Sequence, residues 1–125
     1  MVKKTVKKSS EMFKDIIVNG ILEKKGKDIT ILNLTGLHNS MFDYFIICNG
    51  TSKPQTEAIA ESIQYEVKKA IGENPRQVEG LMNAEWILID YFDVIVHVFQ
   101  KEAREFYNLE RLWADAEVTI LENKE

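Results

Sequence analysis

The sequence predicts an α/β (α+β) fold in which a mixed β-sheet of about five strands carries helices mainly on one face. Two segments have apolar residues at helical spacing, and several shorter segments are apolar and rich in β-branched residues. The expected order is helix, two strands, helix, two or three strands and a terminal helical segment. Because only two long helices precede the last strands, a sheet covered mainly on one side is the natural architecture.

Length and composition indicate one globular domain. The chain has 125 residues, of which 45% are hydrophobic and 29% are charged. Residues 1–9 carry four lysines and are expected to form a flexible basic tail, followed by a single domain over residues 10–120. The formal net charge of −4 argues against coating of nucleic acid and favours a basic partner. The start of the chain has no secretory h-region and no apolar run approaches the roughly 20 residues that cross a bilayer, so we expect a cytoplasmic protein.

Two segments have helical spacing. The first begins at Ser10, and Gly26 is expected to take the left-handed conformation after its last turn. The second begins after Ser52, which fits a capping box with Gln55, and ends at Gly72. Each segment is expected to bury one apolar stripe, the first with Phe13, Ile17 and Ile21 and the second with Ile59, Ile63, Val67 and Ile71.

Two strands are expected between these helices, at residues 28–36 and 44–50. The first alternates apolar and other side chains, and the second is apolar throughout. Cys48 lies in the second strand, where a free thiol most often behaves as a small buried hydrophobe. A further short strand is expected around Val78.

The segments "EWILID" and "DVIVHVF" predict a β-hairpin with a tight turn at residues 91–92 and with Asp90 paired to Asp93. Because side chains alternate along a strand, the hairpin has two different faces. One face is aliphatic and suits a helix layer. The other can be open, as a large apolar patch at an interaction site, or can be a second buried face. The aliphatic face comprises Ile87, Ile89, Val94, Val96 and Val98, and the mixed face comprises Trp86, Leu88, Ile95, His97 and Phe99.

The sequence gives little support for catalysis or for a cofactor. The two histidines have no metal-ligand spacing with other residues, and nothing brings Cys48 and His97 together as a nucleophilic pair. The carboxylates Glu85, Asp90 and Asp93 do not form the alternating pair that would chelate magnesium from one strand face. We therefore expect no enzymatic activity, no metal and no cofactor.

The segment "KEAREFYNLERLW", residues 101–113, mixes aromatic and charged side chains. Arginine, tyrosine and tryptophan are the residues most enriched in interface hot spots, which predicts a surface for a partner. The alternative is a terminal helix that folds back with Phe106, Leu109 and Leu112 in the core. Both interpretations remain open at this point.

Three motifs, "DYFIICNGTS", "EGLMNAEWILIDYFDVIVHVF" and "EAREFYNLERLW", closely resemble the ribosomal silencing factor family, also called the Iojap family. The resemblance runs from about Ile21 to Ala116. It implies a nucleotidyltransferase-like fold without the catalytic carboxylates, and a function that is not enzymatic. One departure is Phe92, which stands where the family usually has a glycine, and it suggests a different turn type or an aromatic side chain at the hairpin tip.

The resemblance also implies a function and a partner. Members of the family bind ribosomal protein fourteen of the large ribosomal subunit, prevent joining of the small subunit and lower translation when nutrients are scarce. It further implies a possible homodimer in the free state, no direct nucleic-acid specificity and no membrane. The alternatives are a large-subunit assembly factor, as organellar relatives are, a divergent enzyme of the nucleotidyltransferase fold, or an RNA-binding module.

The expected partner-binding residues come from the mixed hairpin face and from the terminal motif. Trp86 and His97 correspond to the tryptophan and the histidine of the family's hairpin motif. The complete predicted set is Trp86, Leu88, Asp90, His97, Phe99, Arg104, Tyr107, Leu109, Glu110, Leu112 and Trp113.

Overall fold

The computed structural model describes residues 9–123, so nearly all of the expected basic tail lies outside the described residues. Within them, helices and strands alternate in the predicted order and a sixth strand follows the terminal helical segment. The elements are α1 (Ser10–Glu23), β1 (Lys27–Asn33), β2 (Tyr44–Gly50), α2 (Lys53–Ile71), β3 (Gln77–Glu79), β4 (Trp86–Asp90), β5 (Val94–Gln100), α3 (Lys101–Tyr107), α4 (Leu109–Leu112) and β6 (Glu117–Ile120).

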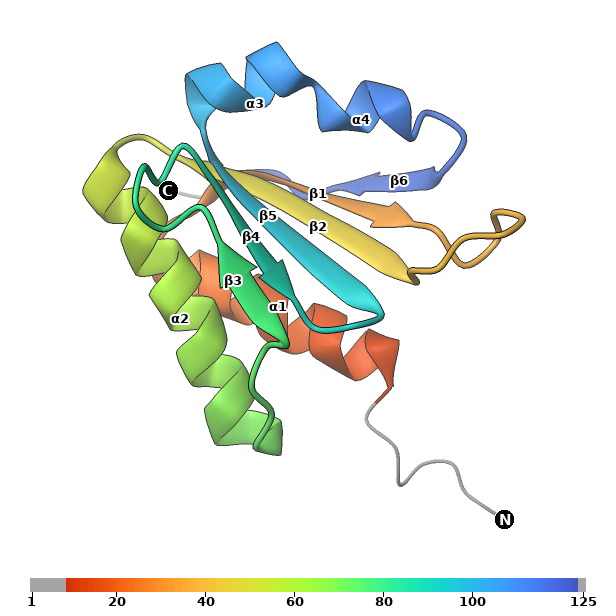
Figure 1. Ribbon diagram of the computed structural model, residues 1–125, viewed down its shortest axis with the longest axis horizontal. Helices are drawn as coiled ribbons and strands as arrows, with labels where there is room; N and C mark the ends of the chain where they lie inside the picture. Colours follow the sequence, from red (N-terminus) through yellow and green to blue (C-terminus); the bar gives the residue numbers. More distant parts are fainter. Residues whose placement is uncertain (1–8, 124–125) are drawn as a thin grey trace.

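The strands form one mixed sheet in the order β3-β4-β5-β2-β1-β6. The central pair, β2 and β5, is parallel, and the other pairs are antiparallel. Helices α1 and α2 lie on one side of the sheet, which we call the first face, and the short helices α3 and α4 lie on the opposite side, the second face (Figure 1). The predicted mixed α/β architecture is confirmed, with six strands in the described part of the chain where about five were expected.

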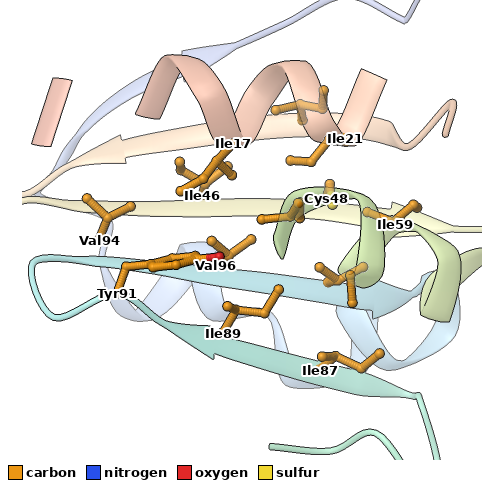
Figure 2. Close-up of a cluster of buried hydrophobic side chains, with 14 of the residues drawn as sticks. Ile17, Ile21, Ile46, Cys48, Ile59, Ile87, Ile89, Tyr91, Val94 and Val96 are labelled. Atoms are coloured by element: carbon orange, nitrogen blue, oxygen red, sulfur yellow. The ribbon is translucent and has the colours of Figure 1, made fainter. Parts of the chain in front are cut away.

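The main core lies between the first face and helices α1 and α2 (Figure 2). The aliphatic face of the β4–β5 hairpin contributes to it, as predicted. At Gly20 the two helices approach closely, because a Cβ atom there would lie 2.9 Å from the Cα atom of Ile63. Beside this contact the Ser62 hydroxyl donates a hydrogen bond of 2.7 Å to the Gly20 carbonyl. Cys48 is buried in this core as predicted, and burial raises the pKa of its thiol to about 12.

The helix ends agree with the sequence in α2 and differ in α1. The Ser52 hydroxyl accepts from the Gln55 backbone N–H at 3.2 Å, and Gly72 has a left-handed φ of 70°. After α1, however, Lys25 takes the left-handed conformation, with φ 61°, so the expectation for Gly26 was wrong. Gly26 is instead buried against Ile21, whose Cγ2 would lie 2.4 Å from a Cβ at that position. The glycine is therefore needed for close packing.

The β4–β5 hairpin has a longer turn than predicted. Trp86 lies opposite Phe99, two residues away from the expected partner His97. Because the shift is an even number of residues, each side chain keeps its predicted face. The turn is closed by Asp90, whose Oδ1 accepts from the Phe92 N–H at 2.7 Å. Phe92 adopts the left-handed φ of 73° that a glycine would take more easily, and its ring is exposed at the hairpin tip.

Candidate partner-binding surface

The second face of the sheet is partly covered by α3 and α4 (Figure 1). The hypothesis of a fully open face is therefore wrong at its centre, where His97 is 3% exposed and Phe99 is fully buried. The cause is local: α3 follows β5 directly, the chain turns back across the sheet, and Leu109 inserts into a second apolar cluster. The buried members of this cluster are Leu32, Leu34, Phe45, Ile47, Ile95, Phe99, Leu109 and Ala116.

A group of aromatic and apolar side chains on this face stays accessible to solvent. Trp86 and Leu88 are partly exposed on β4, and Tyr107 at the end of α3 is 49% exposed. The Tyr107 ring lies 4.7 Å from the Trp86 ring, and the Trp86 ring lies 5.0 Å from that of Phe99. We call Trp86, Leu88 and Tyr107 the aromatic patch. Trp86 and Leu88 are the solvent-accessible part of the predicted mixed face, and Tyr107 adjoins them from α3.

The buried His97 fixes the orientation of Trp86. The Trp86 indole N–H donates a hydrogen bond of 3.1 Å to Nδ1 of His97, so this nitrogen must be unprotonated. Burial lowers the pKa of His97 to about 3, which keeps the ring neutral near pH 7. Its other nitrogen, Nε2, is buried and has no hydrogen-bond partner within residues 9–123. His97 thus supports Trp86 from below and does not itself face solvent.

Arg104 ties the terminal segment to the sheet. Its guanidinium donates to the Asp28 carbonyl at 2.6 Å, to Asn49 Oδ1 at 2.8 Å and to Thr30 Oγ1 at 3.0 Å. It also forms an ion pair of 2.6 Å with Glu110 of α4. Only 11% of the Arg104 side chain is exposed. Arg104 and Glu110 therefore hold α3 and α4 in place, which differs from the exposed contact role expected for them.

The other predicted residues divide into supporting and accessible positions. Asp90 is 4% exposed and binds Arg76 at 2.7 Å, so it stabilises the hairpin turn. Leu109 is buried, and Trp113 packs edge-on against Phe45 with ring centroids 5.2 Å apart. Leu112, in contrast, is 75% exposed on α4. Burial of Leu112 in the core, the alternative interpretation, is therefore wrong.

Phe106 was not among the predicted partner-binding residues, and it is 81% exposed. One of the two interpretations of the sequence placed Phe106 and Leu109 together in the core, on one terminal helix. The helix instead breaks at Asn108, whose φ of 49° is left-handed, so the two side chains no longer share a face. Phe106 and Tyr107 line a cavity of about 390 Å³ beside the aromatic patch. Its other lining residues are Glu85, Gln100, Glu102 and Ala103.

The described residues contain neither a metal-binding cluster nor a membrane-spanning helix. No group of three or more histidine, cysteine or acidic side chains there is placed to hold a metal ion. None of the helices in the described part has the length and apolar character needed to span a membrane.

These features define a small α/β domain with a mixed six-stranded sheet and a partly covered aromatic face. A family model described as "Ribosomal silencing factor during starvation" matches residues 7–125. The chain belongs to the ribosomal silencing factor family.

Named relatives agree with this assignment. The chain is 40% identical to "Ribosomal silencing factor RsfS" of Halalkalibacterium halodurans, over 91% of this chain and 96% of the relative. It is 44% identical to the protein of the same name from Bacillus subtilis, over 80% of this chain and 83% of the relative. It is also 27% identical to the mouse protein "Mitochondrial assembly of ribosomal large subunit protein 1", over 79% of this chain and 44% of the mouse protein.

Solved structures show the same fold. A crystal structure of a Chromobacterium violaceum protein superposes with a TM-score of 0.80 at 34% identity, covering 85% of this chain and 87% of the other. A crystal structure from Bacillus halodurans superposes with a TM-score of 0.75 at 36% identity, covering 90% of this chain and 99% of the other.

Proposed function

We propose that this protein binds the large ribosomal subunit through ribosomal protein fourteen and prevents joining of the small subunit. The proposal rests on family membership and on relatives named ribosomal silencing factor. Binding acts by steric occlusion in the cytoplasm and lowers translation when nutrients are limiting. No covalent step is required, so the outcome depends on occupancy of one docking surface.

The aromatic patch is the observation that carries this proposal. Tyrosine and tryptophan anchors with a partly buried base are typical of binding hot spots. Trp86 has such a base, because the buried His97 accepts its indole N–H and Phe99 packs against its ring. The net charge of −4 steers the domain towards a basic ribosomal protein. The fold therefore presents a supported apolar contact on a domain of net negative charge.

The eleven predicted residues take two roles in this proposal. The accessible ones make the contact, and the buried ones maintain the shape of the surface. The proposed contact residues are Trp86, Leu88, Tyr107 and Leu112, with Trp113 at the margin. The proposed supporting residues are Asp90, His97, Phe99, Arg104, Leu109 and Glu110.

Sedimentation of ribosomal subunits with added protein tests the proposal. We expect the unaltered protein to sediment with the large subunit and to reduce the fraction of joined ribosomes. Tyr107→Ala should weaken large-subunit binding by about tenfold or more, since one hot-spot anchor contributes about 2 kcal/mol. Tyr65→Ala is the matched control, because Tyr65 is 62% exposed on α2, on the other side of the sheet. Failure of the parent protein to sediment with large subunits, or equal losses in both variants, would contradict the proposal.

Assembly of the large subunit is a second candidate function. It is favoured by the mouse relative, whose name refers to assembly of the mitochondrial large subunit. The two functions differ in cells that lack the protein. If the function is silencing, cells that lack the protein should have large subunits of normal composition and a higher fraction of joined ribosomes during starvation. Assembly instead predicts the accumulation of large-subunit precursors in growing cells.

A further inference from the structure

The cavity beside the aromatic patch is lined by groups that suit an organic cation. Its volume is about 390 Å³. The lining contains two carboxylates and two aromatic rings, and it contains no lysine or arginine. The six lining residues are Glu85, Gln100, Glu102, Ala103, Phe106 and Tyr107.

The fold brings these groups together from two separate elements. Gln100, at the end of β5, donates its backbone N–H to the Glu85 carbonyl at 2.9 Å and its side-chain amide to the Ala84 carbonyl at 2.9 Å. These bonds fix the start of β4 beside the start of α3. Glu102 and Phe106 are four residues apart on α3 and so lie on the same side of that helix. Glu85 therefore lies at the rim of a surface that α3 completes.

Among the described residues, no lysine or arginine pairs with either of the two carboxylates of the cavity. Neither Glu85 nor Glu102 has an ion pair or a side-chain hydrogen bond within residues 9–123. The two basic residues of α3 are engaged elsewhere: Arg104 binds Glu110 and the sheet, and Lys101 lies 3.8 Å from Glu105. The cavity thus combines unmatched negative charge with exposed aromatic surface.

The two aromatic rings add a second kind of recognition. The rings of Phe106 and Tyr107 lie 5.1 Å apart at an interplanar angle of 87°, and Phe106 is 81% exposed. An aromatic face attracts a cation, and a guanidinium can also stack flat on it. A guanidinium further donates several hydrogen bonds to carboxylates in a fixed geometry. An ammonium group has no planar face to stack, and two carboxylates are too few for a hard metal ion.

We propose that this cavity binds an arginine side chain of the ribosomal partner. The inference rests on the proposed function, because the arginine is supplied by the basic protein that docks on the aromatic patch. Tyr107 belongs to both surfaces, so the apolar contact and the arginine contact are continuous. The cavity would determine the orientation of the partner, whereas the patch supplies most of the contact area.

The affinity for purified ribosomal protein fourteen, measured by calorimetry at several salt concentrations, tests this inference. We expect Phe106→Ala to weaken binding about fivefold or more, as for loss of a partly desolvated cation–π contact. The double variant Glu85→Gln/Glu102→Gln should weaken binding about tenfold at low salt and make the salt dependence shallower. Glu61→Gln and Tyr65→Ala on α2 are the matched controls and should bind like the parent protein. All the altered side chains are exposed, so melting temperatures should remain unchanged.

A double-mutant cycle identifies the arginine. Each surface arginine of ribosomal protein fourteen is replaced by lysine and measured against the parent chain and against Phe106→Ala. One replacement should weaken binding to the parent and cause little further loss in the Phe106→Ala background. If the parent protein binds and the cavity variants bind like the controls, the cavity inference is wrong while the proposed function stands. If the parent protein binds neither protein fourteen nor the large subunit, the proposed function itself fails.

Discussion

Replacement of Arg104 by alanine should loosen the cover of the second face. The guanidinium donates hydrogen bonds to acceptors on β1 and β2 and forms an ion pair with Glu110 of α4. One substitution therefore removes the polar link between α3 and three other parts of the fold. Two of the acceptor residues, Thr30 and Asn49, are 5% and 3% exposed. After truncation of Arg104 these buried acceptors lose their partner.

The expected loss of stability can be worked from these contacts. Hydrogen bonds to charged groups contribute about 1.5–3 kcal/mol each, and a buried acceptor left unsatisfied costs about 1–3 kcal/mol. The contribution of Glu110 must be discounted, because 31% of its side chain is exposed and can be rehydrated. Counting mainly Thr30 and Asn49, we expect Arg104→Ala to lower the free energy of unfolding by about 3 kcal/mol. Arg104→Lys keeps the charge without the planar fork and should recover about half of this.

Urea unfolding followed by circular dichroism measures the effect, provided that the slope of the transition is unchanged. Arg111→Ala is the control, because Arg111 is exposed on the adjacent α4. A second readout is amide hydrogen exchange, which should accelerate in α3 before it accelerates in β5. A loss below about 1 kcal/mol, or an equal loss in the Arg111 variant, would refute the anchoring role.

Two further predictions concern stability. Because the pKa of His97 is about 3 in the folded protein and 6.5 ordinarily, the unfolded chain binds the proton first as the pH falls below 6.5. The free energy of unfolding, measured by urea titration, should therefore fall as the pH is lowered from 6.5 to 5, by at most about 1.4 kcal/mol per pH unit. His97→Gln should remove this pH dependence, whereas the control variant His38→Gln should keep it. Gly20→Ala should destabilise by about 1–3 kcal/mol despite the better helix propensity of alanine, because the new Cβ meets the Ile63 backbone. Gly36→Ala, where the added Cβ has nothing within 4 Å, should change the melting temperature little, and a stabilised Gly20 variant would contradict the packing argument.

Most of the fold could be predicted from the sequence because two patterns do not depend on the exact ends of an element: the helical spacing of apolar residues, and the alternation of side chains between the two faces of a strand. The spacing of apolar residues placed α1 and α2 correctly, and the alternation in the hairpin assigned each side chain to its face. The predicted register of the hairpin was wrong by two residues. That error did not change the face assigned to any side chain, since Trp86 remains on the side of Phe99 and His97. An error of one residue would have exchanged the two faces.

The strand β6 could not be found in the same way. It is four residues long and all of its side chains are exposed, so burial leaves no alternating pattern. Val118 and Ile120 lie at a sheet edge and pair with Leu32 and Thr30 of β1. The pairing depends on contacts between segments about 90 residues apart along the chain, which local sequence does not report.

The composition of the terminal segment could not show which of its residues face a partner, because arginine and the aromatic residues serve both as hot spots and as buried anchors. The conformation of Asn108 decides between these roles. In an uninterrupted helix Phe106, Leu109 and Trp113 would share one side through their spacing of three and four residues. The left-handed φ of 49° at Asn108 ends α3 and reorients α4, so Leu109 enters the core and Phe106 is left outside. Asparagine tolerates this conformation better than most residues do, so the sequence permits the break without requiring it. The exposure of Phe106 is therefore a consequence of one backbone position, whereas Trp86 and Leu88 of β4 stay accessible because α3 and α4 cover only part of the second face.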